Sequence, residues 1–345
     1  MDLKLENKRA LIKTIDEPNP GKIFETTFAF TTTRVLVTAV DLGLFTHIAS
    51  GHHTVADIAK NAGASERGVE ILLNGLASLD FLIKSNGTYD LTPLSEKFLV
   101  KGKPSYFGDF VQHVDGLWEP WSHLTNATKT GKPFRMIEKD HGPAFFEKMV
   151  TQIFPMSYPC AKAAAFSLDV GSAWKNLNVL DIAAGSGAWG IAFAESDVGT
   201  KVTALDLPNV LEVTKKMVNK FDLGQRFSYL SGDLREMDFG ENRYDLVILG
   251  HICHSEGEEK TRELLSRVHR ALKRGGKVLI AEMIADDERK KDVFPLMFAA
   301  NMLVNSTEGN TFTMAQFREW LNEAGFSGMS IIEAPGPSPL IVAGK

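Results

Sequence analysis

Residues 179–190 read VLDIAAGSGAWG, an apolar run that leads into a glycine-rich stretch and then into a second apolar segment. This order is typical of a β-strand, a tight loop and the start of an α-helix. Gly185 and Gly187 would let the backbone approach a ligand closely, and the N-terminus of the following helix attracts negative charge. The stretch therefore predicts a ligand site at the end of a strand.

Strands and helices alternate from this stretch to the C-terminus. Further strands are expected at residues 201–206, 226–231, 244–249, 276–283, 330–334 and 340–344. Helices are expected between them at residues 209–221, 258–272 and 313–325. This alternation predicts an α/β fold, a Rossmann-like doubly wound and mostly parallel sheet of seven strands, in which the last two strands form a terminal antiparallel hairpin.

The N-terminal part of the chain has a helical pattern instead. The predicted helices span residues 34–49, 54–63 and 65–82. Thr54 and Ser65 are suited to begin helices, and Gly63 is suited to end one. Asn86-Gly87 then predicts the turn of a β-hairpin. Residues 1–104 are therefore expected to form a winged-helix domain that is all helical apart from this hairpin.

Many winged helices bind DNA, but the helix that would read the bases carries Arg67 beside Glu66 and Glu70. One arginine next to two glutamates leaves no positive face for phosphate. Apolar residues occupy more than one side of the same helix. The pattern therefore favours packing against another subunit or domain over binding of nucleic acid.

Residues 105–175 are expected to form a helical linker, and residues 176–345 the ligand-binding domain. The linker is rich in aromatic residues and methionine. These residues are typical of a packed core, and also of a wall for an apolar, aromatic ligand. The candidate pocket residues are Trp118, Trp121, Met149, Phe154, Met297 and Met302.

The composition is that of an ordinary globular chain of 345 residues, with 44% hydrophobic and 23% charged residues. The net charge of −5 gives no polybasic surface for nucleic acid or anionic lipid. Cys160 and Cys253 are the two cysteines, which favours a reducing compartment. No signal peptide is visible, and no run approaches the roughly 18 apolar residues of a membrane span. We expect a soluble, cytoplasmic protein without nucleic-acid or membrane partners.

Acidic residues follow the glycine loop at the ends of the next two predicted strands. Asp206 is placed to accept hydrogen bonds from ribose hydroxyls, and Asp233 to accept one from the exocyclic amine of adenine. A dinucleotide is the alternative ligand, because the glycine spacing also satisfies G-x-G-x-x-G. Asp181 opposes that alternative, since a carboxylate ahead of the glycines repels pyrophosphate and suits a ligand with an ammonium group.

The chain resembles the class I S-adenosylmethionine-dependent methyltransferases in four stretches, which read VLDIAAGSGAWG, VTALDLPNV, YLSGDL and YDLVILGHICH. More narrowly, it resembles the two-domain small-molecule O-methyltransferases of the hydroxyindole, plant phenolic and bacterial polyketide type. The resemblance covers nearly the whole chain. It implies the cofactor S-adenosyl-L-methionine and a homodimer formed through the N-terminal winged-helix dimerisation domain.

The resemblance also implies a set of cofactor-binding residues. These are Asp181, Gly185, Ser186, Gly187, Asp206, Leu207, Gly232, Asp233, Leu234, Gly250 and His251. The chain departs from the family pattern at Ala183 and Ala184, where glycines are frequent. It departs again at Gly250, where plant members carry a lysine that contacts the cofactor.

Two histidines stand in GHICHSEG, residues 250–257. The resemblance implies that His254 is the catalytic base, and that His251 walls the methionine pocket. A neutral imidazole with a pKa near 6.5 suits the removal of a proton from a phenol-like hydroxyl with a pKa of about 10. A metal site is the alternative for this pair. No Cys, His or Asp cluster nearby in the sequence would complete its shell, so no metal is expected.

A base histidine is usually oriented by a carboxylate, and no acid adjoins His254 in the sequence. Ser255 follows it, and Asn301 and Thr311 stand at positions where relatives carry acids. Glu308 is the one acid in the segment before the last helix. The sequence therefore leaves open which acid, if any, partners His254, and it offers Asn301 as a second catalytic or substrate-orienting residue.

The sequence thus predicts transfer of a methyl group to a hydroxyl of an apolar, aromatic small molecule. C-methylation of a planar ring and a non-methylating member of the same fold are the alternatives within the fold. A ligand-sensing regulator built on the winged helix is the alternative from a different class.

Overall fold

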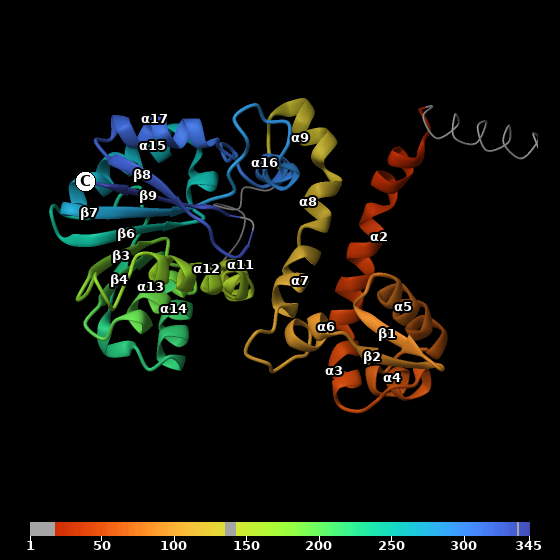
Figure 1. Cartoon of the computed structure of the whole chain (residues 1–345). Coiled ribbons are helices and arrows are strands. Elements are labelled where there is room, and N and C mark those ends of the chain that lie inside the picture. Colours follow the sequence, from red (N-terminus) through yellow and green to blue (C-terminus); the bar gives the residue numbers. More distant parts are fainter. Residues whose placement is uncertain (1–17, 135–142, 337) are drawn as a thin grey trace, which may run out of the picture. The chain divides into compact units, whose positions relative to one another are not determined.

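The computed structural model describes residues 18–134, 143–336 and 338–345. The chain forms two compact units, and it passes from one to the other between Gln112 and His113 (Figure 1). Each unit has a hydrophobic core of its own. Within the described ranges, no helix is long and apolar enough to cross a lipid bilayer.

The first unit is helical and contains one two-stranded sheet. Its elements are α2 (Gly21–Asp41), α3 (Leu44–Ala49), α4 (Val55–Ala62), α5 (Glu66–Ser78), β1 (Leu82–Ser85), β2 (Thr88–Leu91) and α6 (Pro93–Phe98). β1 and β2 are antiparallel, and the Asn86-Gly87 turn between them has positive φ at both residues. The helices predicted at residues 54–63 and 65–82 and their hairpin wing are therefore confirmed, apart from the exact helix ends.

Side-chain caps set the helix boundaries of this unit. The Thr54 hydroxyl accepts a hydrogen bond from the Asp57 N–H, and the Ser65 hydroxyl accepts one from the Gly68 N–H. One prediction is wrong, because residues 34–49 do not form a single helix. Gly43, with a φ of 65°, separates α2 from α3, and the apolar pattern that continues across the break conceals it.

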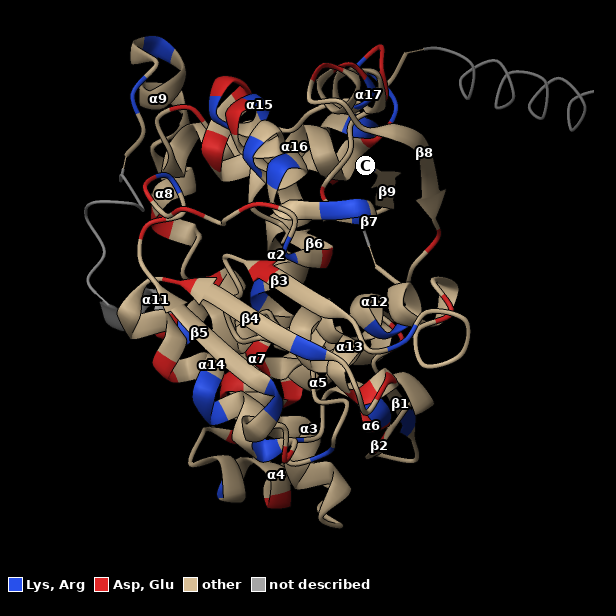
Figure 2. Ribbon diagram, turned by 90° about the vertical axis from the view of Figure 1, so that its left-hand side faces the viewer, with Lys and Arg blue, Asp and Glu red and all other residues tan. Residues whose placement is uncertain are grey.

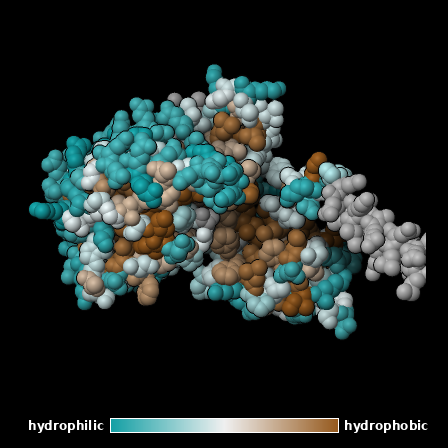
Figure 3. All heavy atoms as spheres, turned by 45° about the horizontal axis from the view of Figure 1, so that its top comes forward, coloured by the Kyte–Doolittle hydropathy of each residue, from teal (hydrophilic) through white to brown (hydrophobic). Residues whose placement is uncertain are grey.

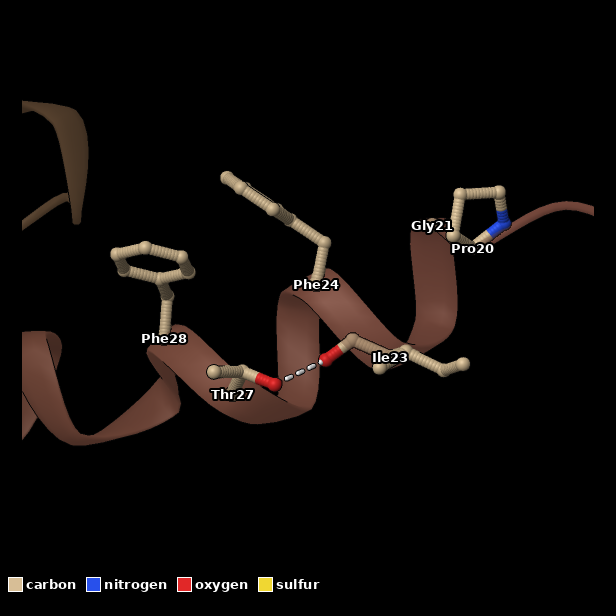
Figure 4. A pocket seen from close by; sticks show the side chains of 6 residues that line it. All are labelled: Pro20, Gly21, Ile23, Phe24, Thr27 and Phe28. Atoms are coloured by element: carbon tan, nitrogen blue, oxygen red, sulfur yellow. Dashed lines mark hydrogen bonds between the residues drawn. The ribbon is translucent and has the colours of Figure 1, made fainter.

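The beginning of α2 exposes large apolar side chains. Ile23 is 71% exposed, Phe24 64% and Phe28 48%. The two phenylalanine rings lie 4.6 Å apart, centroid to centroid, along the shallow hollow drawn in Figure 4. We call Ile23, Phe24 and Phe28 the apolar stripe of α2. Exposed apolar clusters of this kind are typical of surfaces that a partner covers.

Seven strands of the second unit form one sheet, in the order β5-β4-β3-β6-β7-β9-β8. They are β3 (Asn178–Ile182), β4 (Lys201–Asp206), β5 (Phe227–Ser231), β6 (Tyr244–Gly250), β7 (Leu272–Ala281), β8 (Ser327–Ile332) and β9 (Leu340–Gly344). The first five strands of this order are parallel, whereas β9 and β8 pair antiparallel at one edge. This topology confirms the predicted sheet and its terminal hairpin.

Helices cover both faces of the sheet (Figure 1). One face carries α13 (Ala188–Ser196) and α14 (Pro208–Lys220), and the other carries α15 (Cys253–Ala271) and α17 (Met314–Glu323). A buried apolar cluster fills each interface. Each fully buried Leu, Ile or Phe contributes about 1.5–3 kcal/mol to the stability of these clusters.

The remaining helices border the sheet or lie beyond it. They are α7 (Gly108–Asp115), α8 (Trp118–Ser122), α9 (Leu124–Thr130), α11 (Pro143–Gln152), α12 (Phe154–Ser167), α16 (Val293–Asn305) and the short η1 (Gly224–Arg226). α12 packs on α13, and α16 packs against α8 and α9. Lys and Arg residues, in blue, and Asp and Glu residues, in red, are interspersed along the helices (Figure 2). Apolar residues, in brown, gather in patches on a largely teal and white surface (Figure 3).

The junction between α15 and β7 differs from the prediction. α15 spans Cys253–Ala271, but Gly257 inside it has a non-helical φ of 80° and ψ of 176°, so the continuous part of the helix begins at Glu258, as predicted, and ends at Ala271. β7 follows it at Leu272 without a loop. Lys273 to Gly276 therefore belong to a strand that begins four residues earlier than predicted, and this strand pairs with β6 across a local irregularity.

Candidate active site

The predicted site residues gather at one edge of the sheet. Because β3, β4, β5, β6 and β7 are parallel, their carboxyl ends meet at the same edge, where ligands of doubly wound folds bind. The last residues of these strands are Ile182, Asp206, Ser231, Gly250 and Ala281. The glycine loop, the acidic residues and both histidines of the 250–257 stretch follow directly from these ends.

Asp206 joins three of these loops. One carboxylate oxygen accepts from the Gly185 N–H at 2.8 Å, and the other accepts from the Leu207 N–H at 2.7 Å. Its backbone carbonyl accepts from the Gly232 N–H at 3.1 Å. Burial raises the pKa of Asp206 to about 6, although the two amide hydrogen bonds oppose this shift. A carboxylate that accepts one bond per oxygen retains lone pairs for further donors.

The groups around Asp206 are suited to a nucleoside. Leu207 leaves 37% of its surface exposed beside the acid, which offers an apolar contact for a flat base. Asp233 is half-buried, and one of its oxygens accepts from the Arg235 N–H at 2.9 Å. Leu234 packs partly into the core beneath it. An acid, an apolar side chain and a second acid therefore line the edge beside the glycine loop.

Asp181 lies beneath the glycine loop. Its carboxylate is buried and accepts a hydrogen bond from the Gly190 N–H at 2.9 Å. Gly190 lies in the first turn of α13. Burial raises its pKa to about 8, with a smaller contribution from the nearby Asp206 charge. Ser186 is also buried, and Gly187 begins α13 with a φ of 78°. This geometry gives Asp181 a role in holding the loop and the helix together.

Gly250 and His251 form the next part of the edge. A Cβ atom on Gly250 would lie 2.4 Å from Nε1 of Trp189, so the indole occupies the space that a lysine side chain would need. His251 has a left-handed backbone with a φ of 62°, and its Nε2 lies 3.0 Å from Oγ of Ser338. Burial is the main reason that its pKa falls to about 4, so the ring is neutral at physiological pH.

The neighbouring histidine has a carboxylate partner. Nδ1 of His254 lies 2.8 Å from Oε2 of Glu282, and the other oxygen of Glu282 accepts from the His254 N–H at 3.1 Å. Glu282 is 2% exposed and His254 is 9% exposed. Burial alone raises the pKa of Glu282. Attraction to His254 and the hydrogen bonds from it outweigh burial, so the net pKa is lowered. Glu282 is therefore an anion that fixes the imidazole.

This pair answers a question that the sequence left open, namely which acid partners His254. Glu308 instead forms an ion pair with Lys260 at 3.0 Å, and its side chain is 56% exposed. Ser255 is exposed, and the buried Thr311 hydroxyl donates to the Pro295 carbonyl. The sequence contained a signal for Glu282. This residue directly follows the apolar run of β7, which pairs with β6, and β6 leads to His254. Parallel neighbours end at the same edge.

Helix α16 carries the predicted residue Asn301, which contacts the predicted residue Trp121 of α8. The rings of His254 and Phe298 meet edge to face, with centroids 5.1 Å apart. One turn later, the Asn301 side-chain oxygen accepts from Nε1 of Trp121 at 2.9 Å and from the Asn305 amide at 3.1 Å. The structure thus brings His254, Asn301 and Trp121 together around α16, with Asn301 acting as an acceptor for the indole.

The other predicted pocket residues fall into three groups. Trp118 and Met297 lie on α8 and α16 with 48% and 52% of their surface exposed, whereas Met302 is buried in α16. Met149 packs with α14 in a small apolar cluster, whose Val150 lies beside the glycine loop. The described contacts do not bring Met149 to the α8 and α16 side.

Phe154 is a correction, because it lies elsewhere. Its ring stacks on Tyr158 and lies 5.9 Å from Phe221, centroid to centroid. Phe221 caps the far end of α14, and this helix starts beside Asp206 and is 13 residues long. At 1.5 Å per residue, that end is roughly 20 Å from the site edge. Aromatic composition alone did not distinguish this packing residue from a pocket wall.

Over the part of the chain that the structure describes, no group of three or more His, Cys, Asp or Glu side chains is arranged to hold a metal ion. The described contacts of His254 and Glu282 are instead hydrogen bonds between the two residues.

Comparison with known proteins identifies relatives along nearly the whole chain. Residues 121–327 match the model of an O-methyltransferase domain, and residues 24–101 match that of an O-methyltransferase dimerisation domain. The tetracenomycin polyketide synthesis 8-O-methyl transferase of Streptomyces glaucescens is 27% identical, over 94% of this chain and 97% of the relative. The 3-hydroxy-5-methyl-1-naphthoate 3-O-methyltransferase of Streptomyces sahachiroi is 29% identical, over 91% of this chain and 92% of the relative.

A solved structure shares the fold. Human N-acetylserotonin methyltransferase, determined in complex with S-adenosylmethionine, superposes with a TM-score of 0.83. The match covers 96% of this chain and 99% of the human chain, at 23% sequence identity.

Proposed function

The chain belongs to the S-adenosylmethionine-dependent O-methyltransferase family that carries an N-terminal dimerisation domain, and we propose that it methylates a hydroxyl of an apolar, aromatic small molecule, with His254 as the general base. The observation that carries this proposal is the 2.8 Å contact between His254 Nδ1 and the buried Glu282 carboxylate. A hydroxyl acceptor must lose a proton, and this pair is built to receive one.

The cofactor site is proposed at the glycine loop and the two acids. S-Adenosyl-L-methionine supplies the methyl group on a sulfonium, so the electrophile needs no activation by the protein. Asp206 would accept from the ribose hydroxyls, and Leu207 would contact the base. Asp233 and Leu234 would face the adenine edge. Gly185, held by Asp206, lets the loop backbone approach the sugar and methionine end.

The base is proposed to act through Nε2 of His254. The Glu282 anion accepts a hydrogen bond from the Nδ1–H group, which fixes the tautomer and leaves a lone pair on Nε2. A phenolic hydroxyl with a pKa of about 10 is mostly protonated at neutral pH, so its oxygen becomes a better nucleophile as its proton moves to Nε2. The Glu282 charge also stabilises the imidazolium that forms. General-base catalysis of this kind contributes about 10²–10⁴ in rate.

Asn301 and Trp121 are proposed to orient the acceptor. The indole N–H is already bonded to the Asn301 oxygen, which fixes the planes of both groups. With that oxygen committed, the amide NH₂ of Asn301 is the group available to donate to a polar substituent of the acceptor. Apolar side chains of α8 and α16, among them Trp118 and Met297, supply the adjoining surface.

Two observations support an aromatic acceptor. The relatives named above act, by their names, on a polyketide and on a hydroxynaphthoate, and the structural neighbour acts on N-acetylserotonin. The candidate edge also presents Trp121 and Phe298 beside the base, and aromatic rings pack well against flat apolar ligands.

The homodimer is proposed to form through the first unit. The dimerisation-domain match begins at residue 24, inside the apolar stripe of α2. Removing Phe24 and Phe28 from water in a dimer would release about 1.5–3 kcal/mol for each side chain that becomes fully buried. A second copy of this chain is the partner that the family match supports.

The decisive experiment incubates the protein with S-adenosyl-L-methionine and either a hydroxynaphthoate or an N-acylated hydroxyindole. Formation of S-adenosylhomocysteine together with a methyl ether, identified by NMR of the product, supports the proposal. A methyl group on ring carbon would replace O-methylation by C-methylation. No binding of S-adenosyl-L-methionine by calorimetry would overturn the assignment of the cofactor site.

A further inference from the structure

The first turn of α15, Cys253–Glu256, is structurally separate from the rest of the helix. Gly257 follows it with a φ of 80° and a ψ of 176°, a conformation that is open to glycine alone. A Cβ atom at this position would also lie 2.9 Å from the Glu308 carbonyl oxygen. His254 therefore sits on a short turn that the break at Gly257 separates from the body of α15, to which the Thr261 hydroxyl links it by a 3.3 Å hydrogen bond to the Cys253 carbonyl. We call residues 253–256 the base turn.

Three contacts from outside α15 hold the base turn. Glu282 binds the ring and the N–H of His254. The Asn310 N–H donates to the His254 carbonyl at 2.9 Å. On the third side, Arg235 binds Glu256 with two parallel hydrogen bonds, Nε to Oε2 at 2.8 Å and Nη2 to Oε1 at 2.9 Å.

The arginine contact differs in kind from a surface ion pair. The Glu256 side chain is 5% exposed, and that of Arg235 is 40% exposed. A buried carboxylate needs a charged partner, and the fork of a guanidinium fixes both the distance and the plane of the carboxylate. Lysine would supply the charge without the geometry. The position of Glu256 is therefore determined by the position of Arg235.

Arg235 in turn is fixed to the adenine side of the cofactor site. Its N–H donates to the Asp233 side chain at 2.9 Å, and it directly follows Leu234. The Arg235 backbone thus moves with the two residues that would contact adenine. A continuous chain of contacts runs from Asp233 through Arg235 and Glu256 to the turn that carries His254.

We propose that Arg235 and Glu256 are positioning residues that couple occupancy of the adenine subsite to the placement of the His254 base turn. The proposal rests on the proposed function, because it takes Asp233 and Leu234 as adenine contacts. Cofactor binding would order the 233–235 segment, and the ion pair would then hold the base turn in its active position. Since coupling between two ligands is reciprocal, the acceptor would bind more tightly to the cofactor-loaded protein.

Hydrogen exchange with S-adenosylhomocysteine tests this coupling. The readout is a peptide that covers Ser255 to Lys260, which excludes the positions proposed to touch the cofactor. In the wild-type protein, saturating S-adenosylhomocysteine should slow exchange there by about threefold or more. In an Arg235→Gln/Glu256→Gln double variant, which leaves no buried charge unpaired, the slowing should disappear.

Kinetics of the same variant give a second readout. We expect kcat to fall between about tenfold and hundredfold, with the KM for S-adenosyl-L-methionine changed by less than about threefold. Arg235→Lys should show the same loss of coupling, because it keeps the charge but not the fork. Arg262→Gln is the matched control, since Arg262 pairs with Glu258, Glu319 and Glu323 on the exposed side of α15, and its coupling should equal that of the wild type.

The outcomes separate this inference from the proposed function. If the wild-type protein does not bind S-adenosylhomocysteine, the proposed function fails. If it binds but exchange at Ser255 to Lys260 does not change, or if the double variant retains the full slowing, the coupling is overturned while the methyltransferase assignment stands.

Discussion

The apolar stripe of α2 and the His254–Glu282 pair are opposite exceptions to the rule that apolar side chains are buried and ionisable side chains are exposed. In the first unit, Ile23, Phe24 and Phe28 are apolar and exposed. In the second unit, Glu282 and His254 are ionisable and buried. Most residues of the chain follow the ordinary rule, so both exceptions need a cause. The two regions differ in where the partner of the exceptional side chains lies, either inside the same protomer or on a second one.

The buried pair is complete within one protomer. Both oxygens of Glu282 accept hydrogen bonds from His254, and the pKa of the acid is lowered despite its burial. The α2 stripe has its apolar surface in water, and the family match points to a second copy of the chain as its cover. A buried polar group that is satisfied indicates chemistry, whereas an exposed apolar group indicates an interface.

The largest effect is expected from breaking the buried pair. His254→Gln removes the base, and methylation of a hydroxyl acceptor should fall by about 10²–10⁴ in kcat. Glu282→Gln should lower kcat by a similar or smaller factor, because a neutral amide no longer stabilises the imidazolium. Steady-state assays at saturating cofactor measure both variants.

Glu308→Gln is the matched control for this prediction. It removes a carboxylate of the same type from an exposed ion pair with Lys260, and such pairs contribute at most about 1 kcal/mol. Its kcat should equal that of the wild type. Equal losses in Glu282→Gln and Glu308→Gln would mean that the buried pair has no catalytic importance.

The next effect concerns the exposed stripe. Phe24→Asp places a charge where we expect a subunit contact, and it should raise the dimer dissociation constant by at least about tenfold. A dilution series in analytical ultracentrifugation measures this constant. Ala29→Asp adds the same charge at an exposed position that lies about 100° or more around the helix from each residue of the stripe, and should leave the dimer intact. If both variants dimerise like the wild type, the stripe is not the interface.

Asp206 tests an intermediate case, because it is only partly buried and its carboxylate, among the residues that the structure describes, accepts from backbone N–H groups. Burial raises its pKa to about 6, and the protonated acid cannot accept from both ribose hydroxyls. Since the ligand favours the ionised form, S-adenosylhomocysteine affinity should fall as the pH drops through about 6 and be constant above it. Asp206→Asn should weaken binding by about tenfold at pH 8 and remove this pH dependence. Calorimetry from pH 5 to pH 8 decides, and an unchanged profile in the variant would assign the titration to another group.

Sequence reasoning predicted the elements whose signals are local. The glycine loop, the caps at Thr54 and Ser65 and the Asn86-Gly87 turn depend on residues a few positions apart. The strands alternate with helices, so the parallel sheet follows from known rules of chain connection. Asp206 and Gly185, which the pattern assigned to one site, are joined by a hydrogen bond.

What the sequence did not reveal depends on contacts between distant segments. Glu282 is 28 residues from His254, and the two meet only because β6 and β7 pair in a particular register, with Gly250 opposite Ala281. Phe154 was indistinguishable from a pocket aromatic, since composition does not say which end of a helix a ring packs against. The break at Gly43 was concealed by apolar residues on both sides of it.

The smallest predicted effect concerns strain in the glycine loop, where the cofactor site is proposed. Ala183 has a φ of 54°, a left-handed conformation that costs a non-glycine residue about 1–2 kcal/mol. Ala183→Gly removes this cost but adds about 0.5–1 kcal/mol of backbone entropy to the unfolded chain, so the free energy of unfolding should rise by up to about 1 kcal/mol. Urea denaturation measures it.

Ala184→Gly is the matched control, because Ala184 is buried in the core and lacks a left-handed φ. This substitution removes a buried methyl group and relieves no strain, so the free energy of unfolding should fall by about 1 kcal/mol. Opposite signs for adjacent alanines would show that strain beside the site is tolerated for the geometry of the loop. Equal destabilisation by both substitutions would mean that the Ala183 methyl contributes more through packing than its conformation costs.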